Sequence, residues 1–219
     1  ADKVEPTLWG CHEAMLSEMD LKGEYQRRNL RTVMAVLDVV RERNIAEISD
    51  ADVVGAIIRT AARTGFGGRW ETLSEDPLVI CDIGHNEHGL KYNFGQLSRM
   101  MDSGKFSRLI LVYGSVADKD VDAVLHLLPE NAVYVFTQAD SKRALPAVTI
   151  REKYLSHCQK SGRPVGQVDV VPSVAEALET AFRLAVREEA PLIYIGGSTY
   201  VVSEAVAGFK SSKYPDNED

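Results

Sequence analysis

Residues 78–86 of this chain, Leu78-Val79-Ile80-Cys81-Asp82-Ile83-Gly84-His85-Asn86, decide its fold. The stretch begins with apolar residues after a proline and ends with a carboxylate, a glycine, an imidazole and an amide. This order is typical of a buried parallel strand that delivers polar side chains at its carboxyl end. In open α/β sheets, ligands bind outside the carboxyl ends of the strands. Asp82 and His85 are therefore the first candidates for chemistry.

The composition is that of an ordinary globular protein. The chain has 219 residues, of which 45% are hydrophobic and 26% are charged, so one large or two small domains are possible. The net charge is −7 and no basic stripe offsets it, which argues against a nucleic-acid partner. No apolar run approaches the length of a membrane span, and no signal peptide is visible.

Cysteine usage favours a reducing compartment. Cys11, Cys81 and Cys158 are scattered and form no CxxC pair, which argues against a disulfide framework or a zinc site and fits the cytoplasm. Because the chain starts at Ala1 in mid-pattern, we expect it to be a piece of a longer protein.

The chain divides into a helical part and an α/β part. Apolar residues recur at helical spacing over 24–43, and a second helix is expected from Ser49, with Asp52 completing a variant of the capping box. Three glycines within residues 65–68 then break regular structure. We place a domain boundary near residue 73, which gives domains 1–73 and 74–219.

Short apolar strands alternate with helices in the second part, which is the pattern of a parallel α/β domain. The expected strands are 78–82, 109–113, 132–137, 168–171 and 192–195. The expected helices are 87–101, 119–128, 146–159 and 174–187, and a short final element covers 200–206.

Each candidate residue has a functional and a structural interpretation. Asp82 either accepts hydrogen bonds from a ligand hydroxyl or caps the following turn. His85 either donates to an anion and shuttles a proton, or is an ordinary surface histidine. Asn86 is better explained as a helix N-cap than as a ligand contact.

The remaining candidates give weaker signals. Arg69, in a glycine-rich segment, suits phosphate oxygens, but a solvated loop arginine is the commoner case. Asn29, three residues after Gln26, could contact a nucleobase or phosphate, although such amides more often cap their own helix. Lys119 could bind a carboxylate, and Ser198, after two glycines, could help to bind an anion.

Several motifs are absent from the sequence. It contains no dinucleotide fingerprint, no phosphate loop, no nucleophile elbow and no cluster with metal-ligand spacing. We therefore assign no metal ligand. If the protein uses ATP, its phosphate loop and its Mg²⁺ ligands lie mainly outside these residues.

Taken in order, the motifs resemble the folylpolyglutamate synthase / dihydrofolate synthase family of the Mur ligase superfamily. The matching segments are 21–29 (L-K-G-E-Y-Q-R-R-N), 67–71 (G-G-R-W-E), 82–86 (D-I-G-H-N), 113–120 with its D-K-D, 137–144 with its R-A, and 197–200 (G-S-T-Y). Each motif is weak alone, but six in the right order are specific. The departures, such as Tyr25 for the usual His and Gly67 for Pro, leave the charged positions intact.

The resemblance implies a fold and an activity. The fold would be a Rossmann-like, mostly parallel six-stranded sheet, the Mur ligase C-terminal domain, preceded by the helical end of an N-terminal ATPase domain. ATP, with Mg²⁺, would phosphorylate a carboxylate of dihydropteroate or of a reduced folate, and the amine of L-glutamate would attack the acyl phosphate. The full-length enzyme would be a cytoplasmic monomer, and this chain alone would be inactive.

By the same resemblance, Asn29, Arg69 and Asp82 would contact ATP, and His85 would lie near the γ-phosphate and the incoming glutamate. Lys119 and Ser198 would be weaker candidates for glutamate binding, with His85 and Asp82 as the catalytic pair. Two alternatives stay open: a peptidoglycan Mur ligase, and a non-catalytic α/β ligand-binding module.

Overall fold

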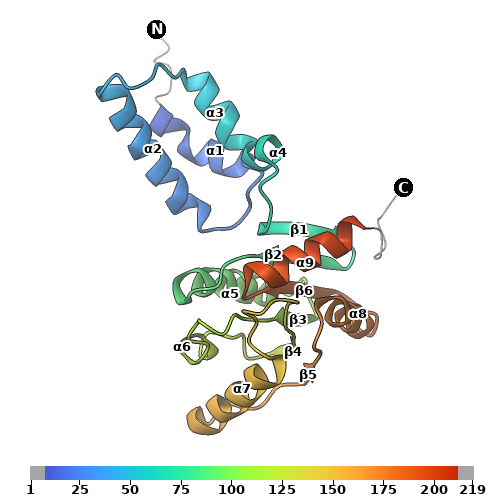
Figure 1. The fold of residues 1–219 in the computed structure, drawn as a ribbon. Coiled ribbons are helices and arrows are strands. Elements are labelled where there is room, and N and C mark those ends of the chain that lie inside the picture. The colour runs from blue at the N-terminus through green and yellow to red at the C-terminus, as the bar shows by residue number, and fades with distance from the viewer. Residues whose placement is uncertain (1–7, 212–219) are drawn as a thin grey trace. The chain divides into compact units, whose positions relative to one another are not determined.

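A computed structural model describes residues 8–211 of the chain. It divides the chain into two compact units, Ala1–Arg69 and Trp70–Asp219, which we describe separately (Figure 1). The boundary expected near residue 73 falls inside strand β1, Arg69–Glu75, because the glycine-rich segment leads straight into a strand instead of continuing as a linker.

The regular elements of the first unit are helices, except that its last residue, Arg69, already begins strand β1. It contains η1 (Leu8–Cys11), α1 (His12–Glu18), α2 (Gln26–Glu42), α3 (Asp50–Ile58) and α4 (Thr60–Thr64). The Ser49 hydroxyl accepts a hydrogen bond from the Asp52 N–H at 3.1 Å, so helix α3 begins where the capping motif predicts. Its core comprises Met15, Met19, Leu30, Met34, Val53 and Ile57.

The second unit is built on a six-stranded sheet with the order β1-β2-β6-β3-β4-β5. Its strands are β1 (Arg69–Glu75), β2 (Leu78–Asp82), β3 (Arg108–Tyr113), β4 (Ala132–Phe136), β5 (Val168–Val170) and β6 (Pro191–Gly196). The pairs β2·β6, β3·β6, β3·β4 and β4·β5 are parallel. The connection from β1 to β2 is too short for a parallel crossover, so β1 forms a hairpin with β2.

Helices cover both faces of this sheet. The helices are α5 (Glu87–Asp102), α6 (Asp122–Leu125), α7 (Ala147–Ser161), α8 (Val174–Ala185) and α9 (Thr199–Lys210). Side chains alternate between two core clusters along each strand. One cluster contains Ile80 and packs against α5, α6 and α7. The other contains the adjacent Val79 and packs against α8 and α9. The strands are therefore buried on both sides, which explains their continuous apolar sequences.

The expected elements of this unit are present, with changes at their ends. Helix α6 is shorter than the expected 119–128, and α9 is longer than the expected 200–206. The six-stranded, mostly parallel α/β fold is confirmed. Of the helices in the described part of the chain, none is both long and apolar enough to cross a membrane.

Candidate active site

The register of the sheet brings the ends of its central strands to one edge. Asp82 at the end of β2 pairs with Gly196 at the end of β6, and Gly196 pairs with Tyr113 at the end of β3. Tyr113 pairs in turn with Phe136 at the end of β4. The polar segments after β2, β3, β4 and β6 therefore leave the sheet along the same edge, where α/β proteins bind ligands.

Asp82 is buried at this edge and satisfied by the protein itself. Its side chain is 1% exposed. One carboxylate oxygen accepts hydrogen bonds from the Gly84 N–H at 2.6 Å and from Asn93 Nδ2 at 2.8 Å, and the other accepts from the Trp70 N–H at 2.9 Å. Such an arrangement stabilises the carboxylate and fixes the backbone around it.

The loop after β2 presents His85. Its Nδ1 lies 3.0 Å from the Ile83 carbonyl oxygen. Because a carbonyl oxygen only accepts, this contact puts a hydrogen on Nδ1 and, in the neutral ring, leaves the lone pair on Nε2. The Asn86 side chain accepts a hydrogen bond from the Gly89 N–H at 2.8 Å, so it is the N-cap of α5, as the sequence predicts.

A cavity of about 470 Å³ opens at the same edge of the sheet. It brings together three of the predicted site residues, His85, Lys119 and Ser198. The other residues that line it are Val116, Arg143, Thr199, Tyr200 and Ser203. Its lining thus contains two cations and an imidazole but no carboxylate, which favours an anionic ligand.

Arg143 reaches this cavity from the loop after β4. Its Nη2 lies 2.5 Å from an Asp118 carboxylate oxygen, and its guanidinium carbon lies 5.9 Å from the centre of the Tyr200 ring. The hydrogen bond from Arg143 lowers the pKa of Asp118. Both side chains of the pair are more than half exposed, with 57% and 55% of their surface accessible, so solvent screens the pair and a ligand carboxylate can compete with Asp118.

Helix α9 begins at the cavity. The Ser198 side chain is 2% exposed and accepts a hydrogen bond from the Tyr200 N–H at 3.2 Å, which makes Ser198 the N-cap of the helix. The hydroxyl oxygen of Ser198 is therefore engaged in capping α9. The amino end of a helix carries unpaired N–H groups and a partial positive charge, which adds to the preference for an anion.

Asn29 and Arg69 belong to the first unit, and neither lines this cavity. Asn29 is exposed on α2 and donates from Nδ2 to the buried Gln26 Oε1 at 2.8 Å, so the two amides face each other as their spacing predicts. The Arg69 guanidinium carbon lies 5.7 Å from the centre of the Phe66 ring, within the glycine-rich segment.

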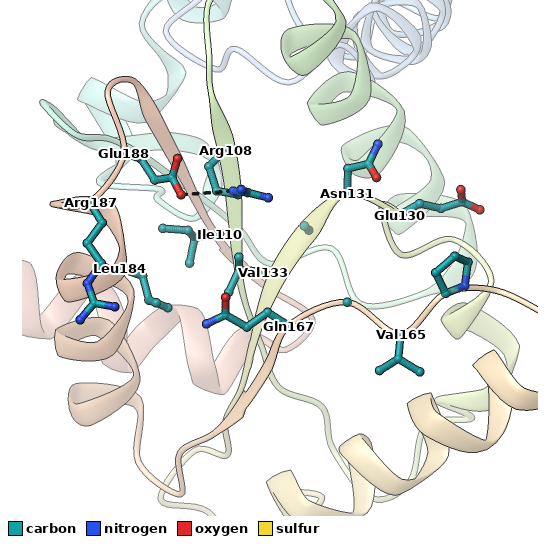
Figure 2. A pocket seen from close by; sticks show the side chains of 13 residues that line it. Arg108, Ile110, Glu130, Asn131, Val133, Val165, Gln167, Leu184, Arg187 and Glu188 are labelled. Atoms are coloured by element: carbon teal, nitrogen blue, oxygen red, sulfur yellow. Dashed lines mark hydrogen bonds and ion pairs between the residues drawn. The ribbon is translucent and has the colours of Figure 1, made fainter.

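A second cavity, of about 450 Å³, lies at the opposite edge of the sheet (Figure 2). Ile110 and Val133 form part of its wall, and two other lining residues, Arg108 and Glu188, form an ion pair at 3.3 Å. It surrounds the amino ends of β3 and β4, away from the strand ends that bind ligands in this fold class. We therefore assign the chemistry to the first cavity, which lies at the carboxyl ends of the strands.

Sequence reasoning did not identify Asn93 as a site residue. It is 0% exposed on α5, between the buried apolar residues Leu90 and Leu97. An amide on an otherwise apolar helix face is the signal that could have found it, since a buried amide requires hydrogen-bond partners. Tyr200 is a second cavity residue that sequence reasoning did not identify, and its hydroxyl lies 3.4 Å from Arg143 Nη1.

Comparison with protein families gives a match over residues 68–198 to the Mur ligase, glutamate ligase domain. The chain belongs to the Mur ligase family. The match covers more than half of the chain and includes the strand end with Asp82, the loop with His85 and Ser198, the N-cap of α9.

Known relatives come from the folate and peptidoglycan branches of this family. The chain is 29% identical over 193 residues to a probable bifunctional folylpolyglutamate synthase/dihydropteroate synthase of Haloferax volcanii, which covers 88% of the chain and 21% of that protein. It is 25% identical over 174 residues to a UDP-N-acetylmuramoyl-L-alanyl-D-glutamate--2,6-diaminopimelate ligase of Wolinella succinogenes, covering 76% and 36%.

The fold is shared with solved structures. A Mycobacterium tuberculosis folylpolyglutamate synthase complexed with ADP matches with a TM-score of 0.68 and 24% identity over 90% of this chain and 42% of that one. The chain thus spans between about a fifth and two fifths of the length of these Mur ligase relatives.

Proposed function

We propose that this chain is the glutamate-binding part of an ATP-dependent ligase that joins L-glutamate to dihydropteroate or to a reduced folate. The carboxylate of the acceptor is activated by phosphorylation, and the amine of glutamate displaces phosphate to form an amide. Family membership and the folate-ligase relative support this reaction class. The protein would act in the cytoplasm, and the three cysteines, which are unpaired, are compatible with a reducing environment.

The observation that carries this proposal is the charge of the cavity at the strand ends. Lys119 and Arg143 line it without any lining carboxylate, and the amino end of α9 opens into it. L-Glutamate carries two carboxylates and one ammonium group at neutral pH. Two cations and a helix amino end can bind both carboxylates of such a ligand.

Each residue of the cavity has a separate role in this proposal. Lys119 and Arg143 bind the carboxylates of glutamate, and Arg143 exchanges Asp118 for the ligand. His85, with Nδ1 held by the Ile83 carbonyl, offers Nε2 to take a proton from the ammonium group, because only the neutral amine is a nucleophile. Ser198 orients the first turn of α9 by capping it.

We assign nucleotide contacts to the first unit. Arg69 has the planar, bidentate donor geometry that suits phosphate, and the exposed Asn29 amide has hydrogen-bonding capacity for a nucleotide. Asp82 was expected to contact ATP as well. Its burial and its three internal donors favour a different role, in which it holds the loop that carries His85.

The relatives include an enzyme complexed with ADP, and the proposed chemistry uses ATP and Mg²⁺. In the described part of the chain, no group of three or more His, Cys, Asp or Glu side chains is placed to hold a metal ion. We therefore assign no Mg²⁺ ligand to the described residues. ATP supplies the phosphoryl group that activates the acceptor carboxylate.

The proposal is tested by following amide formation and phosphate release. The complete polypeptide that contains this chain is incubated with ATP, Mg²⁺ and L-glutamate, with dihydropteroate and tetrahydrofolate in separate reactions. We expect turnover with at least one of them. His85→Ala should lower kcat about a hundredfold or more, as expected for a lost proton-transfer group, and Arg143→Ala should mainly raise the KM for glutamate.

The matched controls replace a histidine and an arginine that lie outside the cavity. His126 and Arg151 are exposed and lie outside the cavity, so His126→Ala and Arg151→Ala should leave both parameters unchanged. Turnover with a UDP-N-acetylmuramoyl peptide instead of a folate would replace the proposal with the peptidoglycan reaction. No amide formation and no phosphate release with either folate or with the peptidoglycan acceptor would favour the non-catalytic module.

A further inference from the structure

A buried amide connects the candidate site to the centre of the sheet. Asn93, on α5, donates from Nδ2 to the Asp82 carboxylate at 2.8 Å and to the Tyr194 hydroxyl oxygen at 2.9 Å. Asn93 and Tyr194 are both 0% exposed and Asp82 is 1% exposed. The amide therefore links a residue of β6 to the carboxylate at the end of β2, through one nitrogen.

The nitrogen and the oxygen of the Asn93 amide differ in their hydrogen bonding. Both hydrogens of Nδ2 have acceptors, whereas Oδ1 is buried and has no partner among the described residues. The reverse orientation would direct Oδ1 at the Asp82 carboxylate, where two acceptors would repel. A leucine would fill a similar volume without an unpaired oxygen. What Asn93 adds over a leucine is therefore the two hydrogen bonds that its Nδ2 donates.

The loop that carries His85 packs directly on this amide. The Gly84 N–H donates to the same Asp82 oxygen as Asn93 does, at 2.6 Å. A Cβ at Gly84 would lie 2.8 Å from both Asn93 Nδ2 and that Asp82 oxygen, so only glycine fits. Any shift of Asn93 or Asp82 thus moves Gly84, and with it the neighbouring His85.

We propose that Asn93 is a positioning residue for the ligase reaction, an inference that rests on the proposed function. It keeps the Asp82 carboxylate aligned on the Gly84 N–H and so holds His85 at the wall of the glutamate cavity. Asn93 lies outside that cavity's lining and acts only through Asp82 and the loop. A merely structural residue would change stability without changing kcat in the folded protein.

Two substitutions separate these roles. Asn93→Leu keeps the approximate volume and removes both donors, so kcat should fall about tenfold or more at every pH. Asn93→Asp keeps the shape, and its protonated form can still donate to Asp82. Because burial and the neighbouring Asp82 charge both favour the neutral form, the pKa of the new carboxyl should be raised.

The expected signature of Asn93→Asp is a pH profile. Its kcat should approach that of the wild type near pH 6, where the new carboxyl carries its proton, and fall about tenfold relative to the wild type by pH 8.5. The titratable groups bonded to Asn93 are Asp82 and Tyr194, and His85 is carried by the loop that packs on this amide. They are common to all variants, so the difference from the wild type isolates the new carboxyl.

The measurements use the complete polypeptide, with Asn131→Asp as the control because Asn131 is exposed and outside the network. Circular dichroism and urea titration at both pH values identify the folded fraction. Wild-type kcat in a folded Asn93→Leu variant, or a pH profile of Asn93→Asp that equals the wild-type profile, would overturn the inference. A loss of kcat that follows the unfolded fraction alone would also overturn it.

A second measurement keeps this inference separate from the proposed function. In ¹⁵N-labelled chain, the His85 Nδ1–H signal reports the hydrogen bond to the Ile83 carbonyl. We expect Asn93→Leu to shift or broaden this signal, and Asn131→Asp to leave it unchanged. An unchanged His85 signal would refute the positioning role, whereas absent turnover in the wild type would refute only the ligase proposal.

Discussion

Replacement of Asp82 by asparagine should destabilise the second unit, although the two side chains have nearly the same shape. The Asp82 carboxylate accepts from three donors with two oxygens. Asparagine has a single oxygen, which can keep the Gly84 N–H and Asn93. Its NH₂ group then faces the Trp70 N–H, donor against donor.

The expected cost follows from these contacts. One buried N–H without an acceptor costs about 1–3 kcal/mol, and the two remaining hydrogen bonds lose their charge assistance, at about 1 kcal/mol each. Removal of a buried charge offsets part of this loss. We therefore expect the free energy of unfolding to fall by about 2–3 kcal/mol, which corresponds to a decrease in Tm of roughly 4–12 °C for a unit of this size.

Urea titration followed by tryptophan fluorescence measures this loss. Trp70 is 5% exposed and donates its backbone N–H to Asp82, whereas Trp9 is 45% exposed in the other unit, so a Trp9→Phe background isolates the signal. Asp122→Asn is the control, since Asp122 is exposed and its carboxylate forms an ion pair with Lys153 at the surface. Wild-type stability of Asp82→Asn would refute the assignment of Asp82 as the centre of this hydrogen-bond network.

Three further predictions concern the edge of the sheet and its surroundings. Gly197 has a φ of +91°, and a Cβ there would lie 2.5 Å from a backbone oxygen, so Gly197→Ala should cost more than about 2 kcal/mol in urea titrations. Gly104 has a φ of +72° with no atom within 4 Å of such a Cβ, so Gly104→Ala should cost only about 1 kcal/mol, and equal losses would contradict the steric argument. The hydrogen bond from Arg143 lowers the pKa of Asp118, so Arg143→Ala should raise that pKa toward its usual range in an NMR titration. The ion pair stabilises the folded protein at neutral pH, and this stabilisation is lost as the pH falls through the lowered pKa of Asp118. Burial raises the pKa of Tyr113 from 10.0 to about 12, so its contribution to stability should be full below pH 10 and decline as the pH rises toward 12, and a Tyr113→Phe variant with the same alkaline unfolding curve would contradict this.

The strands of the parallel sheet could be predicted because burial on both faces demands uninterrupted apolar runs. Strand β1 could not, since its sequence Arg69–Glu75 is mostly polar and follows three glycines. It lies at the edge of the sheet, where only one neighbouring strand pairs with it, and Trp70 is its one fully buried side chain. Edge strands of this kind have little of the pattern on which sequence reasoning depends.

The sequence predicts that the candidate residues follow the carboxyl ends of strands, but not which of them lie next to one another. Asp82 and His85 were found because they end an apolar strand, and Ser198 because it follows the last one. Their proximity depends on the strand order, in which β6, the last strand in the chain, lies between β2 and β3. No local pattern encodes that order, so the cavity shared by His85, Lys119 and Ser198 required the structure.

The hydrogen bonds of Asp82 make stability and activity difficult to separate at this position. The same carboxylate fixes β1 through Trp70, α5 through Asn93 and the His85 loop through Gly84. Loss of activity in an Asp82 variant is therefore no evidence that this carboxylate contacts ATP or glutamate. Arg143 is exposed and its ion pair with Asp118 is screened by solvent, so Arg143→Ala should lower activity with little loss of stability. Activity compared at equal folded fraction distinguishes the two possible roles of Asp82. A raised KM for ATP in Asp82→Asn would support direct contact with ATP, and a lowered kcat alone would support positioning of His85.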